Sequence, residues 1–163
     1  MVPEATTTFR GDYPARDLLK TERMNTSASV LVHQYPVVRQ YMTPSPFTIG
    51  PTQSLAAARQ LMLEHGVRHL PVLDGGRLAG LLSERDLLLV ESMPSVLPAS
   101  VKVEEAMAQD VFAVGPDEPV ADVAGTMIDR KIGSAVVMED ERVVGVFTTV
   151  DALQALRELL RGW

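Results

Sequence analysis

Two pairs of side chains offer the clearest chemistry in this sequence of 163 residues. In each pair a hydroxyl precedes a carboxylate by three positions at the expected start of a helix: Ser83 with Asp86, and Thr148 with Asp151. The two groups then lie about one helical turn apart, beside backbone N–H groups that lack partners within the helix and favour anions. The carboxylate can accept hydrogen bonds from both hydroxyls of a ribose, and the hydroxyl and amides can bind phosphate. The pairs are therefore candidate contacts for a ribose and a phosphate.

Helix capping is the simpler explanation of both pairs, since Ser, Thr and Asp are all favoured in the first turn of a helix. The two pairs, however, occupy equivalent positions of an internal repeat. Residues 38–90 align with residues 103–155 at a constant offset of 65, without a gap. Such a repeat indicates two copies of one supersecondary unit. An aspartate present in both copies, and required by neither packing nor a turn, marks where function is expected.

The composition restricts the classes of function. With 46% hydrophobic residues, the chain can bury the core of one compact domain built from two tandem halves. Fifteen basic and 21 acidic residues give a formal charge of −6 without a basic cluster, which disfavours nucleic-acid partners. The absence of cysteine excludes disulfides and thiolate chemistry and suits a reducing cytoplasm. Because no apolar run is long enough to span a membrane, we expect a soluble cytoplasmic protein with neither nucleic-acid nor membrane partners.

The repeat also organises the chain. Residues 1–35 match neither copy and are expected to form an amino-terminal arm, partly disordered, with a short helix at residues 17–23. Residues 36–92 are the first repeat. Residues 93–100, with two prolines and two serines, are the linker. Residues 101–163 are the second repeat with a C-terminal helix.

Within each repeat the periodicity changes in the same order, from strand to helix to a pair of strands and a second helix. First strands are expected at residues 47–49 and 112–114, where each run ends in Gly-Pro. The helices that follow have apolar residues spaced to share one face: Leu55, Ala58 and Met62 in the first copy, and Val120, Val123 and Met127 in the second. Each half is thus an α/β unit, and the two apolar sheets are expected to pack together.

Turn residues predict differences between the copies. The first hairpin contains Asp-Gly-Gly at residues 74–76, which favours a tight turn. The second has Glu-Asp-Glu at residues 139–141 and is expected to use a more open loop. Between the repeats, Ser100 is expected to cap a short helix that reaches Met107.

Longer motifs resemble a known family. Residues 66–74 (GVRHLPVLD) and 77–87 (RLAGLLSERDL) resemble a cystathionine β-synthase (CBS) domain. Residues 132–138 (IGSAVVM) and 142–153 (RVVGVFTTVDAL) repeat the same frame in more diverged form. Together they resemble a tandem CBS pair, or Bateman module, over residues 38–156. The resemblance implies an α/β fold in which two strand-helix-strand-strand-helix repeats pack through their sheets with pseudo-two-fold symmetry.

The resemblance also implies roles for side chains in clefts between the repeats. In the family, the positions of the two hydroxyl–carboxylate pairs contact ribose and phosphate, cations beside the second strand contact phosphates, and the lead-in to the first strand lines the adenine pocket. The ligand-binding residues implied for this chain are Ser83, Arg85, Asp86, Thr148, Thr149, Asp151, Arg68, His69, Pro71, Thr43 and Pro44. The implied ligand contains adenosine, as AMP, ADP, ATP and S-adenosylmethionine do. NAD-like ligands and cyclic dinucleotides also offer a ribose.

Some of these assignments have plainer alternatives. Arg68 and His69 can equally be solvent-exposed residues at a strand edge, and Pro71 can be an edge-strand feature. In the second repeat Gly133 and Ser134 stand at the positions of Arg68 and His69. The two clefts are therefore expected to be inequivalent, with one of them weak or empty.

No catalytic constellation is apparent, so the chain is not expected to be an enzyme. Its three histidines lack a metal-binding spacing. The resemblance implies a regulatory module that senses an adenosine ligand, forms a homodimer through its helices and transmits occupancy to an unidentified regulated protein. The C-terminal residues Leu153, Leu156, Leu159 and Leu160 suit such a dimer contact, or packing within the chain. The alternatives are a ligand-free scaffold, or an accessory subunit or transcriptional regulator that acts through the amino-terminal arm.

Overall fold

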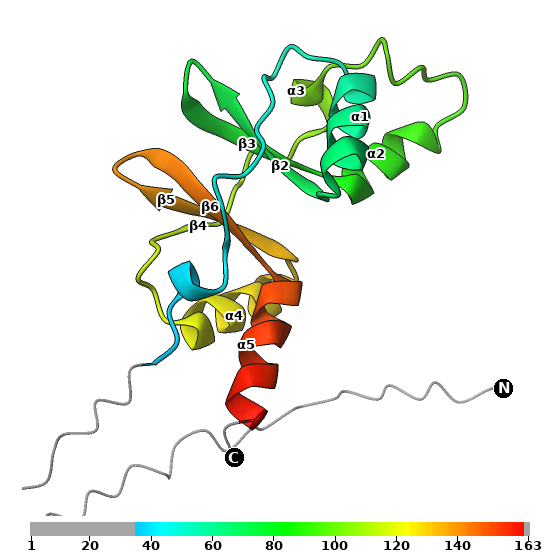
Figure 1. Cartoon of the computed structure of the whole chain (residues 1–163). Coiled ribbons are helices and arrows are strands. Elements are labelled where there is room, and N and C mark those ends of the chain that lie inside the picture. The colour runs from blue at the N-terminus through cyan, green and yellow to red at the C-terminus, as the bar shows by residue number, and fades with distance from the viewer. Residues whose placement is uncertain (1–34, 162–163) are drawn as a thin grey trace, which may run out of the picture. The chain divides into compact units, whose positions relative to one another are not determined.

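The described part of the chain contains two copies of one arrangement of helices around a hairpin (Figure 1). The structure, a computed structural model, describes residues 35–161, so all but the last residue of the arm predicted at residues 1–35, with its helix at residues 17–23, lies outside the described residues. The elements in chain order are the 3-10 helix η1 (Val38–Gln40), β1 (Thr43–Pro44), α1 (Leu55–His65), β2 (His69–Asp74), β3 (Arg77–Ser83), α2 (Glu84–Glu91), α3 (Val103–Ala106), β4 (Ala113–Val114), α4 (Val120–Arg130), β5 (Ser134–Glu139), β6 (Arg142–Thr148) and α5 (Thr149–Arg161). None of the helices within residues 35–161 is long and apolar enough to cross a membrane.

The first helix of each repeat buries one apolar stripe. In α1 the residues Leu55, Ala58 and Met62 are buried, as their spacing predicted, and α4 buries the residues at the equivalent positions. Ser54 caps α1 by accepting a hydrogen bond from the Ala57 amide at 3.2 Å. Burial of a large apolar side chain contributes about 1.5–3 kcal/mol, so these stripes hold each helix on its hairpin.

The two hairpins, β2–β3 and β5–β6, close with turns of the same length. The strand register leaves two residues between the paired ends in both cases, so the prediction of a more open second loop is wrong. Asp140 and Glu141 adopt the left-handed conformation (φ 48° and 61°) that Gly75 and Gly76 adopt in the first hairpin (φ 55° and 85°). Tight turns of this kind need positive φ at both positions. Strand pairing has therefore overridden the residue preference in the second hairpin.

This turn geometry predicts opposite effects from a reciprocal exchange. Glu141→Gly should raise the free energy of unfolding by about 1 kcal/mol, because a non-glycine residue in the left-handed region costs roughly 1–2 kcal/mol. The matched variant Gly76→Glu should lower it by a similar amount. Thermal denaturation should show shifts of about 2–4 °C in opposite directions. Two unshifted midpoints would contradict the turn assignment.

The sheets are less regular than predicted where each repeat begins. In the second repeat β4 runs parallel to β5, pairing Ala113 with Val136. In the first repeat the strand expected at residues 47–49 is reduced to a single bridge between Ile49 and Val72. The sheets therefore have the orders β1-β6-β5-β4 and β2-β3, and β3 contacts β6. The mixed α/β class is as predicted.

The short helix between the repeats differs from its predicted form. α3 spans only Val103–Ala106 and follows Lys102, so the helix expected from Ser100 to Met107 is too long. Ser100 does not cap α3. Its hydroxyl instead donates to the carbonyl oxygen of Leu97 at 2.8 Å, within the linker. A residue favoured at caps has stabilised a linker turn, since a hydroxyl can bond to nearby backbone in either setting.

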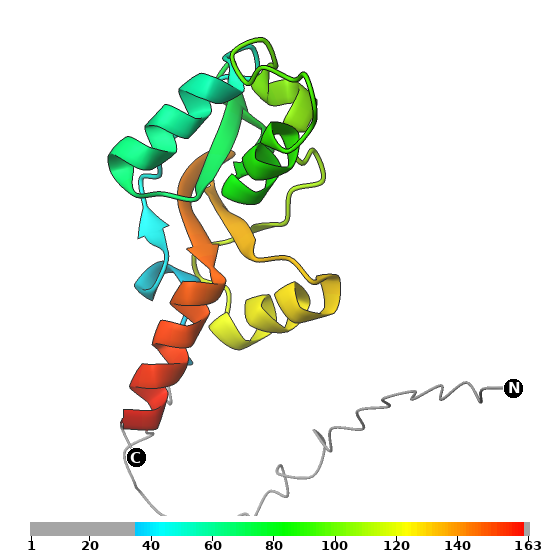
Figure 2. The same ribbon diagram turned by 90° about the vertical axis from the view of Figure 1, so that its right-hand side faces the viewer.

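Each repeat is completed by the segment that precedes the other, and we call these two segments (residues 36–44 and 101–108) the lead-ins. Val38 is fully buried in the core of the second repeat, and Val103 in the core of the first. Their amides donate to carbonyl oxygens in the turns before α4 and α1, at 3.0 and 2.8 Å respectively. Figure 2 shows β1, at the end of the first lead-in, alongside β6 of the second repeat. The two cores are therefore interdependent.

Each lead-in crosses the opposite hairpin at a glycine. Gly80 in β3 faces the thioether of Met107, and Gly145 in β6 faces that of Met42. A Cβ atom at Gly80 would lie 2.9 Å from the carbonyl oxygen of Ala108, closer than real Cβ contacts come. The absence of a side chain is thus what lets the backbone of the lead-in approach the strand.

Candidate functional site

A cleft of about 550 Å³ is lined by residues of both repeats. The first repeat contributes the start of β2, the end of β3 and the start of α2. The second contributes the segment before β4, the end of α4, and the residues where β5 begins and β6 ends. Of the predicted site residues, the cleft brings together Arg68, His69, Ser83, Arg85, Asp86, Thr148 and Thr149. We call it the Asp86 cleft.

Asp86 is anchored through one of its two carboxylate oxygens. Its Oδ2 accepts hydrogen bonds from the Ser83 amide at 2.8 Å and from the Ser83 hydroxyl at 2.6 Å. The Ser83 Oγ in turn accepts from the Asp86 amide at 3.3 Å, which completes the capping box of α2. No hydrogen bond from a described residue reaches Oδ1 of this half-buried side chain. Capping and ligand contact, which the sequence presents as alternatives, are therefore compatible.

The second hydroxyl–carboxylate pair has the same local geometry. Oδ2 of Asp151 accepts from the amide and from the hydroxyl of Thr148, both at 2.7 Å. Thr148 and Thr149 line the Asp86 cleft, but Asp151 is not part of that lining. The two aspartates thus do not converge on one ligand position.

Arg68 and His69 reach the cleft because of how β2 begins. The Arg68 carbonyl oxygen accepts a hydrogen bond from the Glu84 amide at 2.9 Å, which ties the loop before β2 to the start of α2. In the β2–β3 ladder, His69 pairs with Ser83. Strand pairing therefore sets the half-buried His69 beside the capping box, and both side chains line the cleft.

Burial is the main cause of an altered pKa in this cleft. It lowers the pKa of the His69 imidazole below its ordinary value, and the positive charge of Arg68 acts in the same direction. The carboxylates of Asp86 and Glu84 oppose these effects. Because the direction is downward, His69 is mainly neutral at pH 7 in the absence of a ligand.

Besides Asp151, three predicted site residues lie outside the lining of the Asp86 cleft. Pro71 is fully buried in β2, where its carbonyl oxygen accepts from the Ile49 amide at 3.1 Å. Thr43 and Pro44 form β1, are exposed, and pair with Val146 and Gly145 of β6. A ligand-binding role for these residues stays a prediction.

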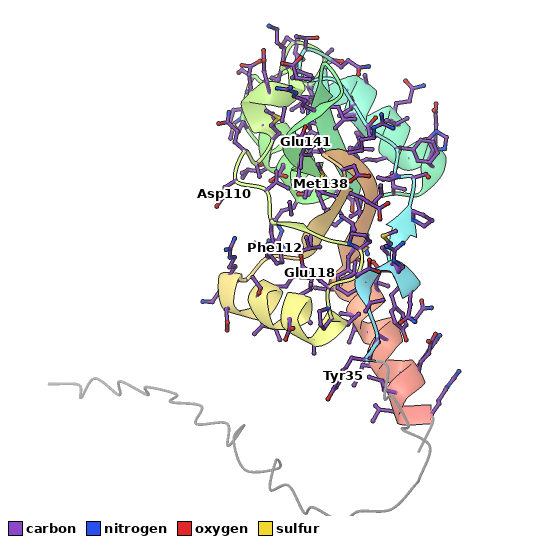
Figure 3. All side chains as sticks on the ribbon, turned by 90° about the vertical axis from the view of Figure 1, so that its left-hand side faces the viewer. Tyr35, Asp110, Phe112, Glu118, Met138 and Glu141 are labelled. Carbon is purple, nitrogen blue, oxygen red and sulfur yellow. The ribbon has the colours of Figure 1, made fainter. Side chains whose placement is uncertain are left out.

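Several lining residues were not predicted from the sequence. Asp110 and Phe112 lie on the segment before β4 (Figure 3), and Lys131 follows the last turn of α4. Lys131 has the left-handed conformation (φ 55°) that Gly66 has at the end of α1 (φ 64°). The offset of 65 could have revealed this exchange of glycine for lysine. Only the structure shows that this lysine lines the same cleft as the start of α2.

The cationic residues of the Asp86 cleft have no cationic counterparts at the offset of 65. For Arg68, His69, Arg85 and Lys131 the counterparts are Gly133, Ser134, Val150 and Gly66. The second hydroxyl–carboxylate pair is therefore not surrounded by an equivalent set. This difference in composition supports the prediction that the two clefts bind unequally.

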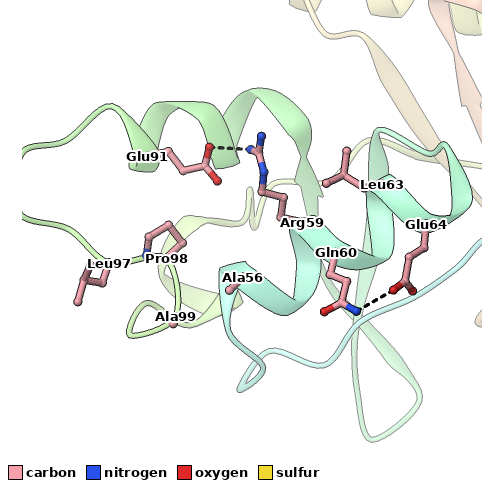
Figure 4. A pocket seen from close by; sticks show the side chains of 9 residues that line it. All are labelled: Ala56, Arg59, Gln60, Leu63, Glu64, Glu91, Leu97, Pro98 and Ala99. Carbon is pink, nitrogen blue, oxygen red and sulfur yellow. Dashed lines mark hydrogen bonds and ion pairs between the residues drawn. The ribbon is translucent and has the colours of Figure 1, made fainter.

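A separate hollow of about 530 Å³ lies between α1, the end of α2 and the linker (Figure 4). Most of its lining is apolar, and each of its charged side chains has a hydrogen-bond partner within the lining. Arg59 donates to Glu91 at 2.6 Å, and the Gln60 amide donates to Glu64 at 2.7 Å. The one cation of this lining, Arg59, is held in that ion pair, so the hollow offers no unpaired cation to an anionic ligand.

The fold agrees with a family comparison. The chain matches the CBS domain over residues 38–92 and again over residues 103–158. It belongs to the CBS domain family. The tandem match agrees with the two cores described above, so the chain contains a CBS pair.

Related proteins carry the same pair in different contexts. The CBS domain pair of protein MJ0100, solved in complex with 5′-methylthioadenosine and S-adenosyl-L-methionine, is similar with a TM-score of 0.67 and 28% identity, covering 78% of this chain and 98% of that one. Hypoxic response protein 1 of Mycobacterium tuberculosis is 26% identical over 121 residues, covering 74% of this chain and 85% of that protein. An inosine-5′-monophosphate dehydrogenase of Korarchaeum cryptofilum is 30% identical over 131 residues, covering 80% of this chain. The CBS pair spans only 25% of the length of that enzyme.

Proposed function

We propose that this CBS pair is a regulatory module, not an enzyme, and that it binds an adenosine-containing ligand in the Asp86 cleft. The proposal is carried by the capping box of α2, which holds Oδ2 of Asp86 and leaves Oδ1 without a partner among the described residues, on a side chain that lines a cleft shared by both repeats. A free carboxylate oxygen can accept from ribose hydroxyls, and charge-assisted hydrogen bonds of this kind contribute about 1.5–3 kcal/mol each. AMP, ADP, ATP and S-adenosylmethionine all carry the required ribose.

A ligand in this cleft contacts both repeats at once, so its binding can change how the two repeats are arranged. It favours whichever relation of the two halves allows both sets of contacts. The lining segment before β4 continues directly from the second lead-in, whose Val103 fills the core of the first repeat. We propose that the resulting change in the relation of the halves is read by a regulated partner protein in the cytoplasm.

Exposed apolar residues on the helices support self-association. On α5, Leu153, Leu156 and Leu160 are exposed to 63%, 49% and 66%, and Ile128 on α4 is exposed to 74%. We propose that these helices form a homodimer contact, since monomeric proteins rarely expose such a patch without a partner. The same surface favours the second candidate function, a scaffold whose clefts stay empty.

The comparison with MJ0100 supports the ligand class, because that CBS pair was solved with two adenosine-containing molecules. The similarity to an inosine-5′-monophosphate dehydrogenase over a quarter of its length supports a module that can work alongside an enzyme.

Calorimetric titration with adenosine, AMP, ADP, ATP and S-adenosylmethionine tests the proposal. At a free ligand concentration about tenfold above Kd, one site adds about 1.4 kcal/mol to the free energy of unfolding. The melting midpoint should then rise by about 3–6 °C. If none of the five binds or shifts the midpoint, the scaffold function is the better account.

A further inference from the structure

The fixed charges that line the Asp86 cleft cancel. Three permanent cations, Arg68, Arg85 and Lys131, face three acids, Glu84, Asp86 and Asp110. A phosphate-bearing ligand would therefore add negative charge to a neutral cleft. Uncharged adenosine would not, so the cleft needs a further source of positive charge only for the phosphorylated ligand.

His69 is the lining residue whose ordinary pKa lies closest to neutral pH. It is half-buried, and its pairing with Ser83 places it against the capping box. The charged groups that share the cleft with it come from every surrounding element: Arg68 before β2, Glu84, Arg85 and Asp86 on α2, Asp110 before β4, and Lys131 after α4. Since these fixed charges balance, one proton on His69 changes the net charge of the lining from zero to +1.

We propose that His69 is a specificity-determining residue that takes up a proton when a phosphate-bearing ligand binds, so that the Asp86 cleft selects such ligands over uncharged adenosine. The inference rests on the proposed function. It adds a coupling between ligand charge and pH at this cleft.

The direction of the coupling follows from two opposed effects. In the free cleft, burial and Arg68 lower the pKa of His69. An anionic phosphate nearby raises it, because an opposite charge favours the protonated form. Between the two pKa values the complex holds more protons than the free protein, so affinity must fall as pH rises through that window. Linkage allows at most about a tenfold loss per pH unit for one proton.

Titrating ADP into the full chain at a single pH near 7, in buffers with different ionisation enthalpies, measures the proton uptake. The ADP phosphate itself titrates near pH 6, so the deciding quantity is the difference between the parent and His69→Gln. We expect proton uptake by the parent to exceed that of His69→Gln by roughly half a proton or more. His65→Gln is the matched control. His65 stacks on Phe47 with ring centroids 3.7 Å apart and is not part of the cleft lining, so this control should behave like the parent.

Adenosine separates this inference from the proposed function. Its binding should show no proton uptake and no dependence on pH across the same range. If ADP binds parent and His69→Gln with equal proton uptake, the inference is overturned and the proposed function stands. If adenosine binds and ADP does not, the inference is likewise overturned and the proposed function stands. If no adenosine compound binds the parent, the inference and the proposed function are both overturned.

A second measurement covers the case in which His69→Gln binds no ADP. In the parent, the NMR titration of the His69 ring should give a pKa at least about one unit higher in saturating ADP than without it. The His65 ring should not change. An unshifted His69 overturns the inference whatever the substitution does.

Discussion

Asp86→Asn should weaken the binding of adenosine and of ADP by about ten- to a hundredfold, with little change in stability. Asparagine keeps an oxygen that can accept from the Ser83 amide and hydroxyl, as Oδ2 does now at 2.8 and 2.6 Å. It removes the charge and replaces the free Oδ1, which costs charge-assisted hydrogen bonds of about 1.5–3 kcal/mol. A contact to the ribose predicts equal losses for both ligands, since both carry the same sugar. Calorimetry on the parent and on Asp86→Asn measures the two ratios.

Asp151→Asn is the matched control for Asp86→Asn. Its capping geometry is the same, with two bonds of 2.7 Å from Thr148, but it does not line the Asp86 cleft. Binding at that cleft should therefore change less than twofold, on the order expected for a side chain away from the site. Equal losses in the two variants, together with two identical sites in the parent, would contradict the inequivalence of the clefts.

Gly80→Ala should lower the free energy of unfolding by about 1–3 kcal/mol, the usual cost of overpacking. The new Cβ would meet the thioether of Met107, which can move, and the carbonyl oxygen of Ala108 at 2.9 Å, which belongs to the backbone. Ala108 also exchanges two hydrogen bonds with Leu81, both 2.9 Å long, so relief of the clash would strain that bridge. Thermal denaturation should show a fall of about 2–4 °C per kcal/mol.

Gly145→Ala supplies a graded comparison for this prediction. Its Cβ would also meet a methionine thioether, but the nearest backbone oxygen, on Thr43, lies at 3.2 Å. The loss of stability should therefore be smaller than for Gly80→Ala. Adding Met107→Ala to Gly80→Ala should recover only part of the loss, because the backbone contact remains. Full recovery would show that the thioether alone accounts for the effect.

The sequence predicted most of the fold because its strongest signals were local. The stripe at Leu55, Ala58 and Met62, the hairpins and the repeat all appear in the structure as expected. The failures occur where tertiary contacts decide. Glu141 takes a left-handed conformation because its strands are paired, and Ser100 turns back into the linker. The strand at residues 47–49 reduces to a bridge, since its length depends on its neighbours.

Prediction of the site was limited in the same way. Ser83, Asp86, Arg68 and His69 could be proposed from motif and spacing, and the structure brings them to one cleft. Lys131 could not, because no local pattern distinguishes a lysine at a helix end that faces solvent from one that faces another repeat. The exchange of the lead-ins between the two cores could not be predicted from the sequence either. An offset of 65 shows that two segments are equivalent but not which core each one enters.

The exchanged lead-ins impose an order on the way this chain acquires its structure during synthesis. The first repeat cannot close its core when α2 has been made, because Val103 has yet to be added. Val38 is made earlier than any other core residue of the described chain, yet its place lies among Val123, Phe147 and Ala155, near the end of the sequence. At roughly 5–20 residues per second, an apolar side chain therefore waits several seconds for its partners. The first lead-in can therefore take its place only after the second repeat has been made, although it is made before both cores.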